Sequence, residues 1–244
     1  MRTIITLLSL IIATVNSAQT YTQIKVNSDI TLVKISDNAF VHISYTNDPK
    51  FGKFPSNGLI FINNNEAFLF DTPTTITQTK ELVDFIMDSL KLKVIGFVPN
   101  HWHNDCTGGL EYLKNIGVQT YANQLTINIL KEKGLPCPEV GFKDSLQLFL
   151  GDKKILCYYL GAAHSMDNIV VWIPSEQILF AGCMAKSTNS TNLGNTVDGD
   201  LKAYPNTIQK VIEKIPNAKI VIPGHGNFGG IELLTNTYKL SQIK

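Results

Sequence analysis

The sequence predicts an α/β protein, organised as a four-layer αβ/βα sandwich in which two sheets pack face to face with helices outside. Short apolar runs separated by turn residues fill two stretches of the chain, residues 30–70 and 144–181. Each stretch is followed by segments in which apolar residues recur at helical spacing. Two such halves bury their apolar faces when the sheets pack together and the helices cover the outer faces.

The first eighteen residues have the pattern of a secretory signal peptide. Arg2 precedes a mostly apolar run at 4–15, and the small residues Ser17 and Ala18 offer a cleavage site. The apolar run is shorter than the ~20 residues that a membrane-spanning helix needs. We therefore expect a mature domain of residues 19–244 that is exported to the periplasm, soluble and monomeric.

Charge is balanced in this chain, with 21 basic and 20 acidic residues before the leader and its Arg2 are removed. A nucleic-acid enzyme is expected to carry an excess of Lys and Arg or a basic patch. The sequence therefore predicts neither nucleic acid nor membrane as a partner. Its length and its 44% hydrophobic content are typical of one α/β domain with a substantial core.

The first half alternates between strands and helices after an antiparallel start. A helix that ends near Gly134 and Pro136 closes this half. In order, its predicted elements are strands at 31–35, 40–43, 59–62 and 67–70, a helix at 75–90, a strand at 94–98, a helix at 108–116, a strand at 118–122 and a helix at 124–133.

Residues 44–57 interrupt the first group of strands with Pro49, Gly52 and Pro55, which predicts a mobile loop. Its aromatic residues Phe51 and Phe54 are candidate substrate contacts, because exposed aromatic side chains on loops often bind ligands.

The second half repeats the order of strands first and helices later. Its predicted elements are strands at 146–150, 154–160, 168–173 and 178–181, a helix at 204–214, a strand at 219–222 and a helix at 231–240.

Four of the five histidines lie in short motifs at the ends of predicted strands. His101 and His103 are two residues apart, so an extended backbone would point both side chains to one face. With His164 they would form a three-histidine site with one open position, an arrangement that lowers the pKa of zinc-bound water to about 7. His42 lies in an alternating apolar run, and a structural role is expected for it.

A second set of metal ligands is suggested by Asp105, Cys183 and His225. Carboxylate, thiolate and imidazole together suit zinc. Cys183 follows an apolar strand at its end, where side chains become accessible. Taken alone, Cys183 has a second interpretation as an ordinary buried thiol.

Four cysteines in an exported protein ordinarily suggest two disulfides. Cys183 belongs to a predicted metal site, and Cys106 directly follows Asp105. Cys137 and Cys157 are then the uncommitted pair, and the sequence leaves open whether they bond.

These motifs, in this order and spacing, resemble the class B metallo-β-lactamases whose second zinc is held by Asp, Cys and His. The resemblance covers nearly the whole mature chain and implies the metallo-β-lactamase fold. It rests on residues 58–60, 69–73, 101–105, 164–172, 182–186, 193–195 and 223–226.

The resemblance implies two zinc ions per chain and hydrolysis of penicillins, cephalosporins and carbapenems, which would confer antibiotic resistance. A hydroxide held between the ions would attack the lactam carbonyl, and the zinc ions would stabilise the carbonyl oxygen and the departing nitrogen. Asp105 would also orient the hydroxide. The implied ligands are His101, His103 and His164 for one zinc, and Asp105, Cys183 and His225 for the other.

Further roles follow from the same resemblance. Lys186 would pair with the substrate carboxylate, and Asn195 would bind the substrate near the lactam carbonyl and assist catalysis. Asp71 would hold loops near the metals by hydrogen bonds, and Asp167 and Asn168 would act similarly beneath His164.

The sequence has two alternative interpretations, another hydrolase of the same fold and a zinc-binding protein without activity. The fold also hosts thioester hydrolases, nucleases and oxygen-reducing proteins. The glyoxalase-type thioester hydrolases extend the motif by a histidine at the position of Cys106, which disfavours that activity. A secreted zinc-binding protein without activity should have a closed site, whereas the predicted 44–57 loop and Lys186 favour an enzyme.

Overall fold

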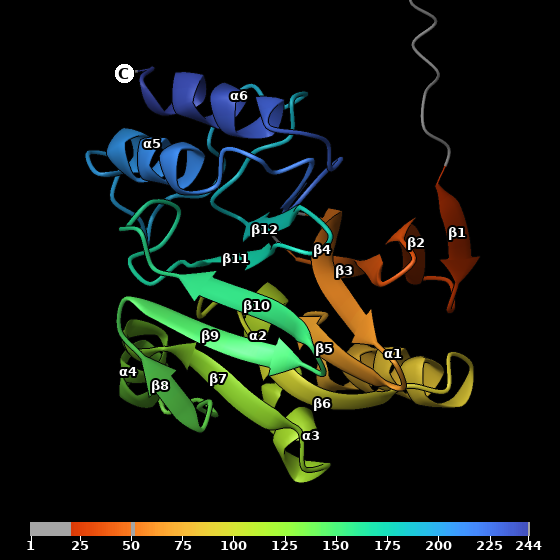
Figure 1. The fold of residues 1–244 in the computed structure, drawn as a ribbon. Coiled ribbons are helices and arrows are strands. Elements are labelled where there is room, and N and C mark those ends of the chain that lie inside the picture. Colours follow the sequence, from red (N-terminus) through yellow and green to blue (C-terminus); the bar gives the residue numbers. More distant parts are fainter. Residues whose placement is uncertain (1–20, 50–51, 244) are drawn as a thin grey trace, which may run out of the picture.

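The computed structural model describes residues 21–49 and 52–243 as four layers, helix, sheet, sheet and helix (Figure 1). The predicted signal peptide, residues 1–18, lies outside the described residues. The predicted fold class is confirmed, because two sheets face each other and helices cover their outer faces.

The first sheet has eight strands that lie in sequence order, β1 to β8. Strands β1 to β5 pair antiparallel, and β5 to β8 pair parallel, as expected where helices connect consecutive strands. The strands are β1 (Thr22–Lys25), β2 (Ile30–Ser36), β3 (Ala39–Asp48), β4 (Gly52–Asn63), β5 (Glu66–Phe70), β6 (Lys93–Val98), β7 (Gln119–Asn123) and β8 (Val140–Phe142).

The second sheet has five strands in the order β13-β12-β11-β10-β9. Its pairs are antiparallel except for β12 and β13, which are parallel and are connected through helix α5 (Tyr204–Lys214). The strands are β9 (Ser145–Leu150), β10 (Lys153–Tyr158), β11 (Val170–Ile173), β12 (Ile178–Gly182) and β13 (Ile220–Pro223).

Helices α1, α3 and α4 pack on the first sheet, and α5 and α6 pack on the second. The N-terminus of α1 is capped by Thr75, whose hydroxyl accepts from Gln78 N at 3.2 Å. No helix among the described residues has the length and apolar character needed to cross a bilayer. The helices are α1 (Ile76–Asp88), α2 (Asn104–Thr107), α3 (Leu110–Asn115), α4 (Gln124–Glu132), α5 (Tyr204–Lys214) and α6 (Glu232–Ser241).

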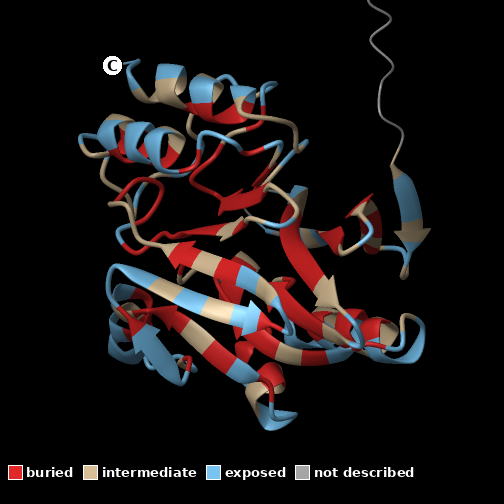
Figure 2. Cartoon of the chain, viewed as in Figure 1, coloured by how far each residue is buried: buried red, intermediate tan, exposed pale blue. Residues whose placement is uncertain are grey.

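Three apolar cores separate the layers. Phe70 from the first sheet and Phe180 from the second pack in the central core, with ring centroids 6.4 Å apart. Leu82 of α1 lies in the core outside the first sheet, and Tyr204 of α5 lies in the core outside the second. Buried residues accordingly line the inner sides of the outer helices (Figure 2).

The predicted mobile loop at 44–57 is wrong. These residues extend β3 and β4 into one long hairpin, with pairing that continues from Ser44↔Ser56 to Asp48↔Gly52. The polar residues at its base are buried and paired with each other, since Ser44 Oγ lies 3.1 Å from Ser56 Oγ. The proline and glycine residues near the turn led to the wrong prediction, because strand ends at the edge of a sheet accept both residue types. Phe51 lies outside the described residues.

Candidate metal centre

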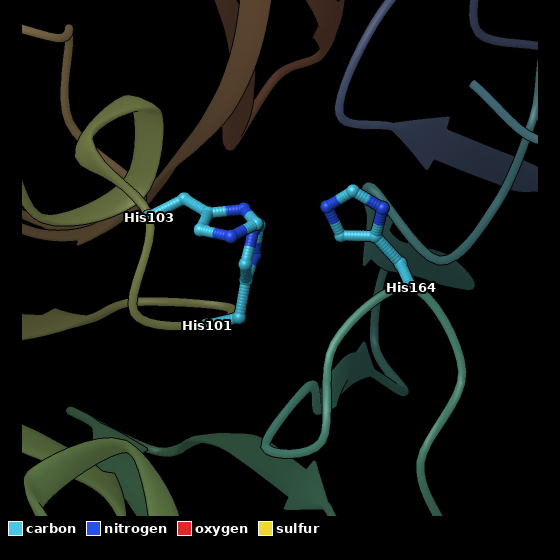
Figure 3. Close-up of side chains that lie close together, drawn as sticks. All are labelled: His101, His103 and His164. Atoms are coloured by element: carbon cyan, nitrogen blue, oxygen red, sulfur yellow. The ribbon is translucent and has the colours of Figure 1, made fainter. Parts of the chain in front are cut away.

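Three histidine rings converge where the two halves of the fold meet (Figure 3). His101 and His103 follow β6, and His103 is the residue that precedes helix α2. His164 comes from the loop between β10 and β11. The Nε2 atom of His101 lies 2.7 Å from Nδ1 of His103, and one ligand atom from each of the three residues lies within 4.8 Å of the others. Three imidazoles with this convergence fit a zinc ion.

The outer nitrogens of two rings have partners that fix their orientation. Nδ1 of His101 lies 3.2 Å from Oδ1 of Asn100, and Nε2 of His103 lies 2.9 Å from Oδ2 of Asp198. These contacts leave the remaining nitrogen of each ring facing the common centre, which is how ligand histidines are oriented in metal sites.

Burial sets the protonation state of two of these rings. His101 is fully buried and His164 is 6% exposed. Burial lowers the pKa of His101 to about 3 and that of His164 to about 3. Both rings are therefore neutral at pH 7, the form that binds a metal ion.

A second group of potential ligands lies beside the first. Nε2 of His225 is 3.1 Å from Oδ2 of Asp105 and 3.4 Å from Sγ of Cys183. Sγ of Cys183 is 3.9 Å from the same Asp105 oxygen. The outer nitrogen of His225, Nδ1, donates to the carbonyl oxygen of Pro55 at 2.8 Å, so Nε2 faces the group.

The charged groups in this second set shift one another's pKa values. The hydrogen bond from Cys106 holds the pKa of Cys183 well below its usual range, although burial opposes the shift. Burial acts to raise the pKa of Asp105, but the hydrogen bond from His225 outweighs it and lowers that pKa. Burial likewise acts to lower the pKa of His225, but the charge of Cys183 raises it well above 6.5. A proton on His225 balances two anionic groups here, and a divalent cation fits the same place.

Glycines let the chain bring Cys183 and His225 together. Gly182, with φ +56°, ends β12, and a Cβ there would lie 2.3 Å from Cγ of Asn100. A Cβ on Gly224 would lie 2.3 Å from Sγ of Cys183. Any side chain at either position would displace the residues that carry the site.

Asp71 supports the ligands from below, as the sequence predicts. It directly follows β5, with φ +57°, and its Oδ1 accepts from the backbone N–H of Asn100 at 2.5 Å. The Asn100 side chain donates to the carbonyl oxygen of Ile169, which follows the His164 loop. Burial raises the pKa of Asp71 well above 3.8. One chain of hydrogen bonds thus connects the two sheets beneath the metal centre.

Asp167 and Asn168 hold the His164 loop, also as predicted. Oδ1 of Asn168 accepts from Ser165 N at 3.0 Å, and its Nδ2 donates to the carbonyl oxygen of Gly161 at 3.0 Å. Oδ2 of Asp167 accepts from the hydroxyl of Thr126 in α4 at 2.8 Å. The loop is therefore fixed both internally and to a helix of the other half.

Lys186 lies beside the metal centre, whereas Asn195 lies on an exposed loop. Nζ of Lys186 donates to the carbonyl oxygen of Cys183 at 2.8 Å, and burial lowers its pKa. Lys186, His225 and the 189–194 loop line a cavity of about 320 Å³. The Asn195 side chain accepts instead from the backbone of Val197 at 3.3 Å. The structure brings Lys186 to the site and turns the Asn195 side chain to its own loop.

Sequence reasoning missed Asn100 and Asp198, which contact ligand histidines, and Asn57, which holds the turn that carries His225. Asn100 directly precedes His101, so its place at a strand end was visible. Asn57 was assigned to the mistaken loop, and Asp198 lies 95 positions from His103 with no local motif. All four cysteines have free thiols, so Cys137 and Cys157 do not form a disulfide.

Comparison with known proteins identifies close relatives. A metallo-β-lactamase type 2 from Bacteroides fragilis is 48% identical over 240 residues, which cover 98% of this chain and 96% of the relative. A metallo-β-lactamase type 2 from Pseudomonas aeruginosa is 34% identical and covers 86% of this chain and 84% of its own. The solved metallo-β-lactamase from Pontibacter korlensis superposes with a TM-score of 0.84 at 37% identity, over 88% of this chain and all of that one. No protein-family model matches the sequence.

The four-layer sandwich and its two groups of potential metal ligands are those of a metalloprotein of the αβ/βα class. The identity and coverage of the relatives decide the particular family. The chain belongs to the metallo-β-lactamase family of hydrolases.

Proposed function

We propose that this enzyme uses two zinc ions to hydrolyse the β-lactam amide bond of penicillins, cephalosporins and carbapenems. The observation that carries the proposal is the presence of two adjacent ligand groups, each with its donor atoms within 4.8 Å. The names of the curated relatives support the reaction class. The proposed ligands are His101, His103 and His164 for one zinc, and Asp105, Cys183 and His225 for the other.

Hydrolysis adds water to the lactam carbonyl carbon, breaks the amide C–N bond and delivers a proton to the nitrogen. Zinc ions in such sites lower the pKa of water and polarise a carbonyl group, which is what this reaction needs at neutral pH. The lowered pKa of Asp105 keeps its carboxylate ionised, so it can accept a hydrogen bond from the attacking water and orient it.

The cavity beside the metal centre suggests how the substrate is held. The Lys186 ammonium lines this cavity and offers a charge partner for the carboxylate of a β-lactam. Asn195 would reach the lactam carbonyl after a change in the conformation of its exposed loop. Phe54 stands edge-on to His225 with ring centroids 5.8 Å apart, and thus places an apolar side chain beside one proposed ligand.

We also propose that the protein acts in the periplasm as an exported monomer and protects its host against β-lactams. The apolar run after Arg2 supports export. N-terminal sequencing of the protein recovered from a periplasmic extract should begin near residue 19, and an intact Met1 would contradict export.

The reaction is tested with the purified protein, a penicillin, a carbapenem and a thioester as substrates. We expect turnover of both β-lactams, loss of turnover after chelation and recovery with zinc. Asp105→Asn should lose activity, while Asp37→Asn, at an exposed position 95% accessible, should retain it. Absence of chelator-sensitive β-lactam turnover would contradict the proposal, and turnover of the thioester alone would favour a thioester hydrolase.

A further inference from the structure

The segment 196–200 lies against both halves of the three-histidine group. Its Asp198 carboxylate lies 2.9 Å from Nε2 of His103, which belongs to the half that contains the first sheet. The side chain of His103 is 18% exposed and that of Asp198 is 39% exposed, so the contact lies at the rim of the site.

The backbone of the same segment holds the loop that carries His164. The N–H of Met166 donates to the carbonyl oxygen of Asp198 at 3.0 Å, and the N–H of Asp200 donates to the carbonyl oxygen of Ala163 at 3.0 Å. These two hydrogen bonds stand on either side of His164. The segment therefore contacts His103 of one half and the loop that carries His164 in the other.

Gly199 makes this close approach possible. A Cβ at this position would lie 2.2 Å from the carbonyl oxygen of Ala163 and 2.7 Å from that of His164. Residue 199 must therefore lack a side chain if the segment is to stay against the His164 loop.

The segment also continues directly from the loop at the mouth of the cavity. Residues 189–194 contribute to the wall that includes Lys186, and they are mostly exposed. Internal contacts in this loop are few, such as Gly194 N to Asn192 Oδ1 at 2.9 Å. Its C-terminal attachment to the rest of the protein is the segment 196–200.

We infer that Asp198 is a positioning residue, which orients His103 and connects the 189–194 loop to the three-histidine site. The inference rests on the proposed role of His101, His103 and His164 as ligands. A carboxylate that accepts from the outer nitrogen of a ligand histidine fixes the ring and raises its basicity. Metal binding should then stabilise the loop through Asp198, and loss of Asp198 should weaken the metal at that site.

The first test measures the two metal sites separately by titrating the metal-free protein with Co²⁺. Sulfur-to-cobalt charge-transfer absorption reports the Cys183 site, and equilibrium dialysis reports total bound metal. Asp198→Ala should lower the affinity of the three-histidine site about 10- to 100-fold and leave the Cys183 site unchanged. Asp198→Asn, whose amide oxygen can still accept from Nε2, should lose less, and Asp37→Ala should match the wild type.

Equal weakening of both sites in Asp198→Ala, or no weakening, would overturn the inference. The wild type provides the separate check on the proposed function: if it binds no ion through the histidines, the ligand assignment fails rather than the role of Asp198.

The second test is hydrogen exchange at the backbone amides of residues 189–197, with and without Zn²⁺. In the wild type and Asp37→Ala, zinc should slow exchange in this loop. In Asp198→Ala at saturating zinc, that slowing should be lost while exchange in β6 and β12 stays unchanged, which shows that the fold is intact. Retention of the slowing in Asp198→Ala would overturn the connection between the loop and the metal site.

Discussion

Asn57 of β4 holds Gly224 across the gap between the two sheets, its backbone N–H donating to the Gly224 carbonyl oxygen at 2.8 Å. The Asn57 side chain donates to the carbonyl oxygens on either side, those of Pro223 at 2.9 Å and Gly226 at 2.8 Å. Three hydrogen bonds from one buried residue thus fix the turn that presents His225.

Replacement of Asn57 by alanine should loosen that turn. The buried carbonyl oxygen of Pro223 and the partly buried one of Gly226 lose their donors, which should lower the free energy of unfolding by about 1–3 kcal/mol and weaken metal binding at the Cys183 group. Urea unfolding with and without zinc measures both effects. Asn217→Ala, at an exposed position, is the control and should behave as the wild type. Unchanged stability and affinity in Asn57→Ala would show that the turn holds its shape without this side chain.

Cys183→Ser should weaken the second metal site far more than the first, because the proposed first site contains no sulfur. Titration with zinc should show one ion retained with wild-type affinity and the other bound much more weakly. Cys137→Ser, at a partly buried thiol outside both groups, should leave both affinities intact. An equal loss of both ions would count against the ligand assignment.

Acid should destabilise the protein through His42. Burial lowers the pKa of His42 to about 4, whereas the unfolded chain has a histidine pKa near 6.5. Between these values the unfolded state binds a proton that the folded state excludes, so the free energy of unfolding falls as the pH drops below 6.5. By pH 5 this contribution amounts to about 2 kcal/mol.

The His42 prediction is checked by urea unfolding of the metal-free protein at pH 7.5 and pH 5. His42→Gln should lose about 2 kcal/mol less stability over this range than the wild type. Ser44→Ala, which alters the same buried hairpin without removing a titrating group, should show the wild-type pH dependence. The same pH dependence in His42→Gln would mean that His42 does not titrate in this range.

Lys186→Ala should raise the KM for β-lactams with a carboxylate about tenfold to a hundredfold, the range expected for loss of a hydrogen bond to a charged group. The effect on kcat should be smaller, because the role proposed for Lys186 is to bind the substrate carboxylate, away from the bond that breaks. Steady-state kinetics separates the two constants, and Lys202→Ala, at an exposed position, is the control. A loss in kcat alone would assign Lys186 to the chemical step instead of substrate binding.

The sequence predicted both sheets and most helices because hydrophobic periodicity is local information. Helix α5, predicted and observed at 204–214, shows this clearly. The 44–57 segment shows where local information fails. Its Ser44 and Asn57 are polar, yet they are buried, because Ser44 pairs with Ser56 on the facing strand and Asn57 donates to Pro223 of the other sheet. Strand pairing supplies these partners, and no local pattern predicts them.

The identity of the six proposed ligands was already contained in the sequence, since each stands in a short motif at the end of a strand. The sequence also predicted their division into two groups, whereas the tertiary structure alone showed which residues hold them in place. His103 and Asp198 meet across 95 positions of sequence, and Asn57 reaches Pro223 across 166. Such contacts depend on how two sheets pack, because packing brings distant strand ends to one edge while sequence spacing constrains only near neighbours.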